Sequence, residues 1–309
     1  MKNHLISILS IIALVSFLLF TCKDEKQVVN SEIKYETTGP DSGYLVIVGG
    51  NMKDTSIINR FIALAGGPEA QMIVIPTASG ETKIDNAKAA MVLTSAGAKN
   101  VTVLHTYDTV VANSADFVAP LKKARGVWFD GGRQWHLVDA YANTLTEKEI
   151  RNVLSRGGVI GGSSAGATIQ GSYLVRGDTK TNTVVMGDHE KGFGYLKNSA
   201  IDQHILVRNR QNDLEPVISK YHNLLGIGLD ENTAIVVKGN EFEVIGQSYV
   251  AIHDYRLWQE NPADKRKLKN GAKFFFLRKG DRYNLKTREV TKWGGDPTRN
   301  ILPDTIKKR

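Results

Sequence analysis

The chain has 309 residues, of which 41% are hydrophobic and 23% charged, a balance typical of a globular protein. The net charge is +8, but residues 251–309 alone hold 16 Lys and Arg against 7 Asp and Glu, so the rest of the chain is close to neutral. This distribution argues against a nucleic-acid partner, and the basic end is interpreted as a solvated appendage. Cys22 is the only cysteine, which excludes an intrachain disulfide.

The N-terminal residues predict an export signal. Met1-Lys2 precedes an uncharged apolar run, Leu5–Phe20, which is short for a membrane span and suits the apolar segment of a signal peptide. Cys22 follows this run, and its position resembles that of the lipidated cysteine of bacterial lipoproteins. We therefore expect a signal peptide at 1–21 and a tether at 22–42 anchored in the lipid bilayer through Cys22. The expected location is periplasmic or cell-surface, with an uncleaved N-terminal anchor as the alternative.

Short apolar runs without polar alternation are typical of strands buried on both faces of a parallel sheet. Five such runs are Leu45–Val48, Met72–Ile75, Val101–Leu104, Gly126–Phe129 and Gly158–Ile160. Segments with helical spacing lie between them, such as 57–65, 84–96 and 145–154. The alternation predicts a doubly wound α/β fold whose mostly parallel sheet has helices on both faces.

From about Gly226 onward the pattern changes to short β-like runs at 234–237, 241–245 and 273–277. We therefore expect a catalytic domain at 43–250 and a basic, β-rich extension of the same domain at 251–309.

Glycine-rich loops follow three of the expected strands, namely Gly49-Gly50-Asn51, Asp130–Gln134 and Gly161–Gly166. Each could be simple turn chemistry. Ligands of doubly wound folds, however, gather at the carboxyl edge of the sheet, and three such loops on one edge favour a shared pocket.

The third loop contains a serine at the centre of a Gly-x-Ser-x-Gly pattern, Gly162-Ser163-Ser164-Ala165-Gly166. A nucleophile on a tight strand-to-helix turn needs small neighbours, so Ser164 is a candidate nucleophile. Two alternatives stay open: Ser163 could carry the reactive hydroxyl, or the segment could be a glycine-rich turn that only packs a helix against the sheet.

A serine nucleophile needs a base, and His204 is the histidine in the densest polar context. It lies in Ile201–Arg210, where a strand-like apolar run is interrupted by charged and amide side chains. Buried polar groups persist only when they have partners, so this density calls for a reason.

At this point the chain resembles the cyanophycinase family of serine peptidases, relatives of the aspartyl dipeptidases within the class I glutamine-amidotransferase-like fold. The elements that carry the resemblance are Gly162–Ala167, Gly131–Gln134, and Asp202-Gln203-His204 with Arg208 and Arg210. They occur in the family's order, and the likeness extends from about Tyr44 to Gly246.

The resemblance implies a nucleophile at Ser164 and a general base at His204, with an orienting acid shortly after the serine. Asp178 is the best-placed candidate for that acid, and Asp188 and Glu190 remain alternatives. The acid would hold the imidazole in one tautomer. Backbone amides at Gly132 and Ala165 would form the oxyanion hole.

The resemblance also places Gln134, Asp202, Gln203, Arg208 and Arg210 at substrate-binding positions. The planar guanidinium groups of the two arginines suit a substrate carboxylate. Asp213, in contrast, stands where the family pattern has another basic residue, which leaves open whether cyanophycin, the polymer of β-linked Asp-Arg units, is the substrate. The acidic loop 228–233, with Asp230 and Asn232, also remains open as a wall of the site.

The expected function is therefore that of a serine-type exopeptidase that hydrolyses β-aspartyl or related acidic peptides through an acyl-enzyme, with neither a cofactor nor a metal. Alternatives are a lipase or esterase and a lipid-anchored binding protein of the same fold without catalysis. A cysteine-dependent amidotransferase is excluded, because Cys22 lies in the signal region. A homodimer is left open.

Overall fold

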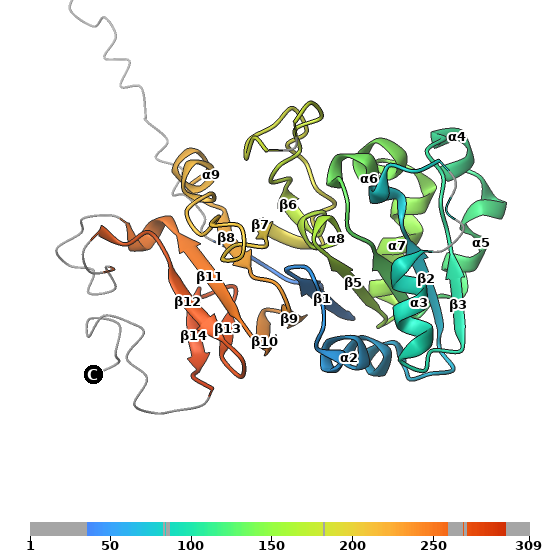
Figure 1. Ribbon diagram of the computed structural model, residues 1–309, viewed down its shortest axis with the longest axis horizontal. Coiled ribbons are helices and arrows are strands. Elements are labelled where there is room, and N and C mark those ends of the chain that lie inside the picture. The colour runs from blue at the N-terminus through green and yellow to red at the C-terminus, as the bar shows by residue number, and fades with distance from the viewer. Residues whose placement is uncertain are drawn as a thin grey trace, which may run out of the picture. The chain divides into compact units, whose positions relative to one another are not determined.

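Two β-sheets organise the protein in the computed structural model, which describes residues 36–82, 84, 87–181, 183–258, 268 and 271–294 (Figure 1). All of these residues belong to one unit of the chain that starts at Lys34. The predicted signal, Cys22 and most of the tether lie outside the described residues. Within the described ranges, no helix has the length and apolar character needed to cross a membrane.

The first sheet has the strand order β14-β13-β10-β9-β1-β5-β4-β2-β3. Its parallel half consists of β1 (Tyr44–Val48), β5 (Val159–Ser163), β4 (Gly126–Phe129), β2 (Gln71–Ile75) and β3 (Asn100–Val103). Its antiparallel half consists of β9 (Thr233–Lys238), β10 (Glu241–Gly246), β13 (Arg282–Asn284) and β14 (Glu289–Lys292). The five runs expected as parallel strands match the parallel half; β1, β2, β4 and β5 are buried on both faces, whereas β3, at the edge of the sheet, is only partly buried.

Helices cover both faces of the parallel half. One face packs against α2 (Thr55–Ala65) and α3 (Lys88–Ser95), where Phe61 meets Trp128 edge-on with ring centroids 5.0 Å apart. The opposite face packs against α5 (Ala115–Lys123), α6 (Gln134–Tyr141) and α7 (Leu145–Ser155). The remaining short helices are η1 (Thr77–Ser79), α4 (Thr109–Ala112), α8 (Ala165–Thr168), α9 (Glu215–Lys220) and η2 (Tyr255–Leu257).

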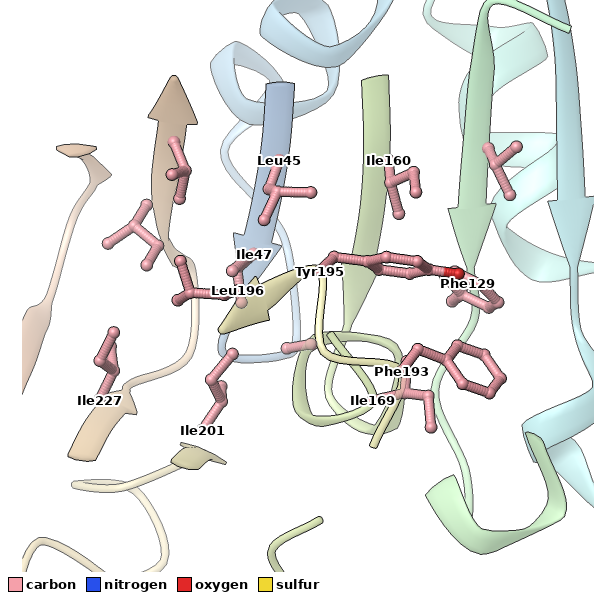
Figure 2. Close-up of a cluster of buried hydrophobic side chains, with 14 of the residues drawn as sticks. Leu45, Ile47, Phe129, Ile160, Ile169, Phe193, Tyr195, Leu196, Ile201 and Ile227 are labelled. Carbon is pink, nitrogen blue, oxygen red and sulfur yellow. The ribbon is translucent and has the colours of Figure 1, made fainter. Parts of the chain in front are cut away.

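The second sheet is mixed and has the order β12-β11-β8-β7-β6. Its strands are β6 (Gly171–Tyr173), β7 (Leu196–Gln203), β8 (Leu225–Leu229), β11 (Tyr249–Asp254) and β12 (Phe275–Arg278). Apolar side chains of this sheet share one buried cluster with the first sheet, as Figure 2 shows for Ile201 and Ile227 alongside Leu45 and Ile47. The common core fixes the carboxyl end of β7 relative to that of β1.

The fold prediction is confirmed in its α/β class and its mostly parallel main sheet, and strands from the C-terminal part belong to both sheets. The expected boundary between 250 and 251 falls inside β11, and β12 joins the second sheet, where Phe275 is buried. β13 and β14 extend the first sheet beyond β10. The basic segment Lys265–Lys267 lies outside the described residues.

Candidate active site

The carboxyl ends of the strands position the Gly49–Asn51 loop, Ser164 and His204. β1 and β5 run parallel with Val48 opposite Ser163, so Ser164 and the Gly49–Asn51 loop leave the sheet side by side. In the second sheet, β7 and β8 run parallel with Gln203 opposite Leu229. The residues that follow these ends form the candidate site.

Ser164 sits on a strained turn between β5 and α8. Its φ of 56° and ψ of −111° are rare for a residue with a side chain, and its amide donates to the Val48 carbonyl at 3.0 Å. A Cβ at position 162 would lie 2.3 Å from the Gly166 carbonyl oxygen, and one at 166 would lie 2.2 Å from the Phe129 carbonyl oxygen. Glycine at both positions therefore permits the tight turn that presents the Ser164 hydroxyl.

A line of hydrogen bonds runs from the Ser164 hydroxyl through His204 to Glu231. Ser164 Oγ lies 2.9 Å from His204 Nε2, and His204 Nδ1 lies 2.7 Å from Glu231 Oε1. Because the carboxylate can only accept, Nδ1 carries the proton and leaves the Nε2 lone pair facing the hydroxyl. Glu231 Oε2 also accepts from Asn51 Nδ2, which keeps the carboxylate in place.

The loop after β1 holds the His204 ring closely. His204 has a φ of 56°, and its amide donates to the Gly49 carbonyl at 3.0 Å. A Cβ at Gly50 would lie 2.1 Å from His204 Cε1, so the ring packs directly against backbone that bears no side chain. Gly50 thus leaves the room that the ring needs beside Ser164.

The electrostatics favour a neutral imidazole. Burial lowers the pKa of His204, the hydrogen bond to Glu231 raises it, and Arg208 lowers it, so that the pKa lies below its ordinary value. Burial by itself raises the pKa of Glu231, but hydrogen bonds from Asn51 and His204 outweigh this and keep that pKa below its usual range. His204 is therefore uncharged at neutral pH and able to accept a proton, while Glu231 is ionised.

The structure corrects the position expected for the orienting acid. The Asp178 carboxylate accepts from the amides of Lys180 and Thr181 and from the Thr181 hydroxyl, within its own loop. The two alternatives are also engaged elsewhere: Asp188 accepts from Thr179, and Glu190 accepts from the Tyr221 hydroxyl. The Nδ1 position that such an acid would hold is taken by Glu231.

The Asp130–Gln134 loop lies beside Ser164. A Cβ at Gly131 would lie 3.4 Å from Ser164 Cβ and 3.9 Å from its Oγ. The amide of Arg133 donates to the Ala78 carbonyl at 2.7 Å, which ties the loop to η1. Gly132 follows Gly131 in this loop, and Ala165 follows Ser164 directly in the chain. The oxyanion-hole roles expected for their amides remain predictions.

Two residues expected to bind substrate have polar atoms engaged by the protein itself. Gln134 is fully buried, and its Nε2 donates to the carbonyls of Val175 and Arg176 at 2.6 and 3.0 Å. Asp202 is also fully buried, and both of its oxygens accept from the Arg176 guanidinium. Asp202 and the Gln134 amide nitrogen thus link segments of the protein to one another, and their expected contacts with substrate remain predictions.

The other three expected substrate residues lie around His204. Arg208 is exposed, and its charge is close enough to His204 to lower the pKa of that ring. Arg210 is half-buried and donates from Nη1 to Gln203 Oε1 at 3.1 Å. The structure therefore places two positively charged side chains close to His204. Their expected role in binding substrate remains a prediction.

Sequence reasoning missed Glu231 and Arg176. Glu231 belongs to the acidic loop 228–233, which the sequence indicated as one candidate for a wall of the site. The spacing between this loop and His204 did not show which of its residues meets the histidine. Arg176 has a φ of 57°, but its sequence context carries no comparable signal. In the ranges that the structure describes, no three His, Cys, Asp or Glu side chains gather to hold a metal ion.

An α/β fold with a serine on a strained strand-to-helix turn, hydrogen-bonded to a histidine that a carboxylate holds, defines the serine hydrolase class. The family model Peptidase family S51 matches residues 45–245, and the chain belongs to that family of serine peptidases. The chain is 32% identical to a cyanophycinase of Geminocystis herdmanii over 80% of this chain and 95% of the relative. It is 28% identical to a cyanophycinase of a Nostoc species over 80% and 87% of the two chains.

Solved structures agree with the fold. A peptidase from an acI-B1 Actinobacterium superposes with a TM-score of 0.57 and 20% identity, over 80% of this chain and 98% of the other. A putative peptidase E protein from Listeria monocytogenes superposes with a TM-score of 0.50 and 18% identity, over 67% and 99%. At these identities the likeness concerns the fold alone.

Proposed function

We propose that this serine peptidase hydrolyses β-aspartyl or similar acidic peptides, with Ser164 as nucleophile, His204 as general base and Glu231 as the orienting acid. The observation that carries the proposal is the line of hydrogen bonds from Ser164 Oγ to His204 at 2.9 Å and from His204 to Glu231 at 2.7 Å. Nucleophile, base and orienting group are thus in order and within hydrogen-bond reach.

The reaction proceeds in two halves. Ser164 Oγ attacks the scissile carbonyl carbon while its proton passes to His204 Nε2, and the oxyanion that forms accepts from the amides of Gly132 and Ala165. His204 then donates that proton to the leaving amine as the C–N bond breaks, which yields the acyl-enzyme. A water molecule repeats the attack, with its proton passing to His204 and from there back to Ser164, and the acid product leaves.

The charges around the site support an acidic substrate. Arg210 donates to Gln203, the residue before His204, and the positive charges of Arg208 and Arg210 both lower the pKa of His204. A β-linked aspartyl residue has a free α-carboxylate beside the scissile bond, which a guanidinium group can bind through two parallel hydrogen bonds. The relatives named as cyanophycinases support the same class of substrate.

The first experiment compares Ser164→Ala, Glu231→Gln and Asp178→Asn, each checked for fold by thermal unfolding. We expect Ser164→Ala to lose on the order of 10⁶ in kcat and all labelling by a fluorophosphonate. Glu231→Gln should lose about 10⁴ because the tautomer is no longer held. Asp178→Asn is the matched control and should stay within about tenfold of wild type. A larger loss in Asp178→Asn than in Glu231→Gln would refute the assignment.

A second experiment addresses the substrate. Insoluble β-Asp-Arg polymer, β-aspartyl dipeptides, α-linked Asp peptides and p-nitrophenyl esters are assayed side by side with wild type and Arg208→Ala. Arg208→Ala should raise KM for the acidic peptides and change it little for neutral esters, because only the peptides have a carboxylate to bind. Turnover of the esters alone would favour an esterase, and no turnover or labelling at all would favour a binding protein.

The proposed location is the periplasm or the cell surface, with a lipid anchor at Cys22. It rests on the apolar run Leu5–Phe20 and the position of Cys22 directly after it. Mass spectrometry of the mature N-terminus tests it, with Cys22→Ser as the variant that should lose the acyl chains and the membrane association. A mature form that starts elsewhere and carries no lipid would rule out the anchor.

A further inference from the structure

Arg176 is a buried arginine whose guanidinium group holds two carboxylates. Its Nε and Nη2 donate to the two oxygens of Asp202 at 3.0 and 3.1 Å, and Nη2 also donates to Asp213. Its Nη1 donates to the Thr183 carbonyl at 3.0 Å. The side chain of Arg176 is 3% exposed, that of Asp202 is 0% and that of Asp213 is 32%, so the cluster opens toward solvent only at Asp213.

The same residue connects two of the sequence motifs. The Arg176 carbonyl accepts from Gln134 Nε2 at 3.0 Å, which ties it to the loop beside Ser164. Asp202 Oδ1, held by the guanidinium, also accepts from the amide of Gln203 at 2.9 Å, and His204 is the next residue. A displacement of Arg176 would therefore move both the Asp130–Gln134 loop beside Ser164 and the segment that carries His204.

The two carboxylates explain why an arginine is present. A buried carboxylate without a partner is costly, and Asp202 and Asp213 converge on one place. A guanidinium group can bind a carboxylate through two parallel hydrogen bonds, and here Arg176 of the protein itself binds Asp202 in this way. A substrate arginine that approached the two carboxylates would find them already occupied.

We propose that Arg176 is a positioning and specificity-determining residue that acts as a built-in guanidinium ligand of Asp202 and Asp213. By filling this place it holds the Gln203-His204 segment in register with Ser164, and it directs the site away from β-aspartyl peptides whose leaving group is arginine. This inference rests on the proposed function, because it assumes that Ser164 is the nucleophile.

The test is chemical rescue of Arg176→Ala. The variant should label with a fluorophosphonate about 100-fold more slowly than wild type, because a misplacement of about 1 Å costs that much. Guanidinium chloride at about 50 mM, far below the molar concentrations that unfold proteins, should increase the labelling rate of the variant at least about tenfold. Sodium chloride at the same concentration should not. The variant should also raise the ratio of kcat/KM for β-Asp-Arg over β-Asp-Leu.

Controls separate the outcomes. Arg151→Ala removes an arginine of α7 that binds Glu147 of the same helix and the carbonyl of Phe193, and it should behave like wild type with no response to guanidinium. If Arg176→Ala does not fold, Arg176→Lys is measured instead, because it keeps the charge and loses the bidentate contact; a slow labelling rate in the folded variant supports the proposal.

Wild-type labelling and selectivity in a folded Arg176 variant would overturn the inference, as would a slow Arg176→Ala that guanidinium does not rescue. Failure of the wild type itself to label would instead refute the assignment of Ser164.

Discussion

The contact between Gly50 and the His204 ring makes Gly50→Ala a sharp test of the site geometry. The added Cβ would lie 2.1 Å from His204 Cε1, 2.6 Å from Nδ1 and 2.7 Å from Nε2. Ordinary contact begins at 3.4 Å, so the ring has to move by about 1.3 Å, the difference from 2.1 Å. That movement breaks or bends the bonds to Ser164 and Glu231, and a misplacement of about 1 Å costs about 10² in rate. We therefore expect kcat to fall by about 10² or more.

The backbone at Gly50 has a φ of +130°, so alanine is strained there independently of the ring. Such strain costs about 1 to 3 kcal/mol of stability, which lowers Tm by several degrees. Gly97→Ala is the matched control, because its φ is +100° and nothing lies within 4 Å of the added Cβ. Labelling rate and kcat are measured with Tm for both variants. If both lose stability but Gly50→Ala keeps kcat within about threefold, the packing of the ring is not what positions the base.

Three further perturbations have expected outcomes. Arg208→Ala removes a positive charge that lowers the pKa of His204, so the acidic limb of the labelling-rate profile should move to higher pH; a limb that stays in place would contradict this. Burial lowers the pKa of His253 from 6.5 to about 3, so below pH 6.5 the unfolded chain binds a proton that the folded chain does not. The free energy of unfolding, measured with urea, should therefore fall by up to about 1.4 kcal/mol per pH unit on acidification between these values, and His253→Leu should flatten that slope. Asp213→Arg would place a second guanidinium beside Arg176 and should lower both stability and labelling rate. A gain in kcat/KM on β-Asp-Arg would show that the contact between Arg176 and Asp213 is not structural.

Local patterns in the sequence determined the class of fold and the surroundings of Ser164. Runs such as Leu45–Val48 lack polar alternation because both faces of the strand are buried, as is typical of a parallel sheet between helices. Gly162 and Gly166 flank a serine because backbone passes within 2.3 Å of where their side chains would begin. These constraints act over a few residues, so they leave a readable pattern.

Tertiary structure decided which carboxylate meets His204 and is therefore proposed as the orienting acid. β7 and β8 lie parallel with Gln203 opposite Leu229, so His204 and Glu231 leave the second sheet at the same edge although 27 positions separate them. Asp178 is as close to Ser164 in sequence as the family pattern suggests, but its loop folds the carboxylate back onto Thr181. Strand pairing between distant segments sets which side chains meet, and no spacing along the chain encodes it.

Arg176 illustrates the same limit for the substrate residues. The motif Asp202-Gln203-His204 indicated that Asp202 belongs to the site, but whether its carboxylate faces substrate or protein depends on what packs against it. Arg176 comes from a different loop, where its backbone has a positive φ, and its guanidinium group holds Asp213 as well as Asp202. A residue's chemistry can be identified from its type and neighbours in the sequence, whereas the partner that uses or neutralises it is chosen by the packing of the whole fold.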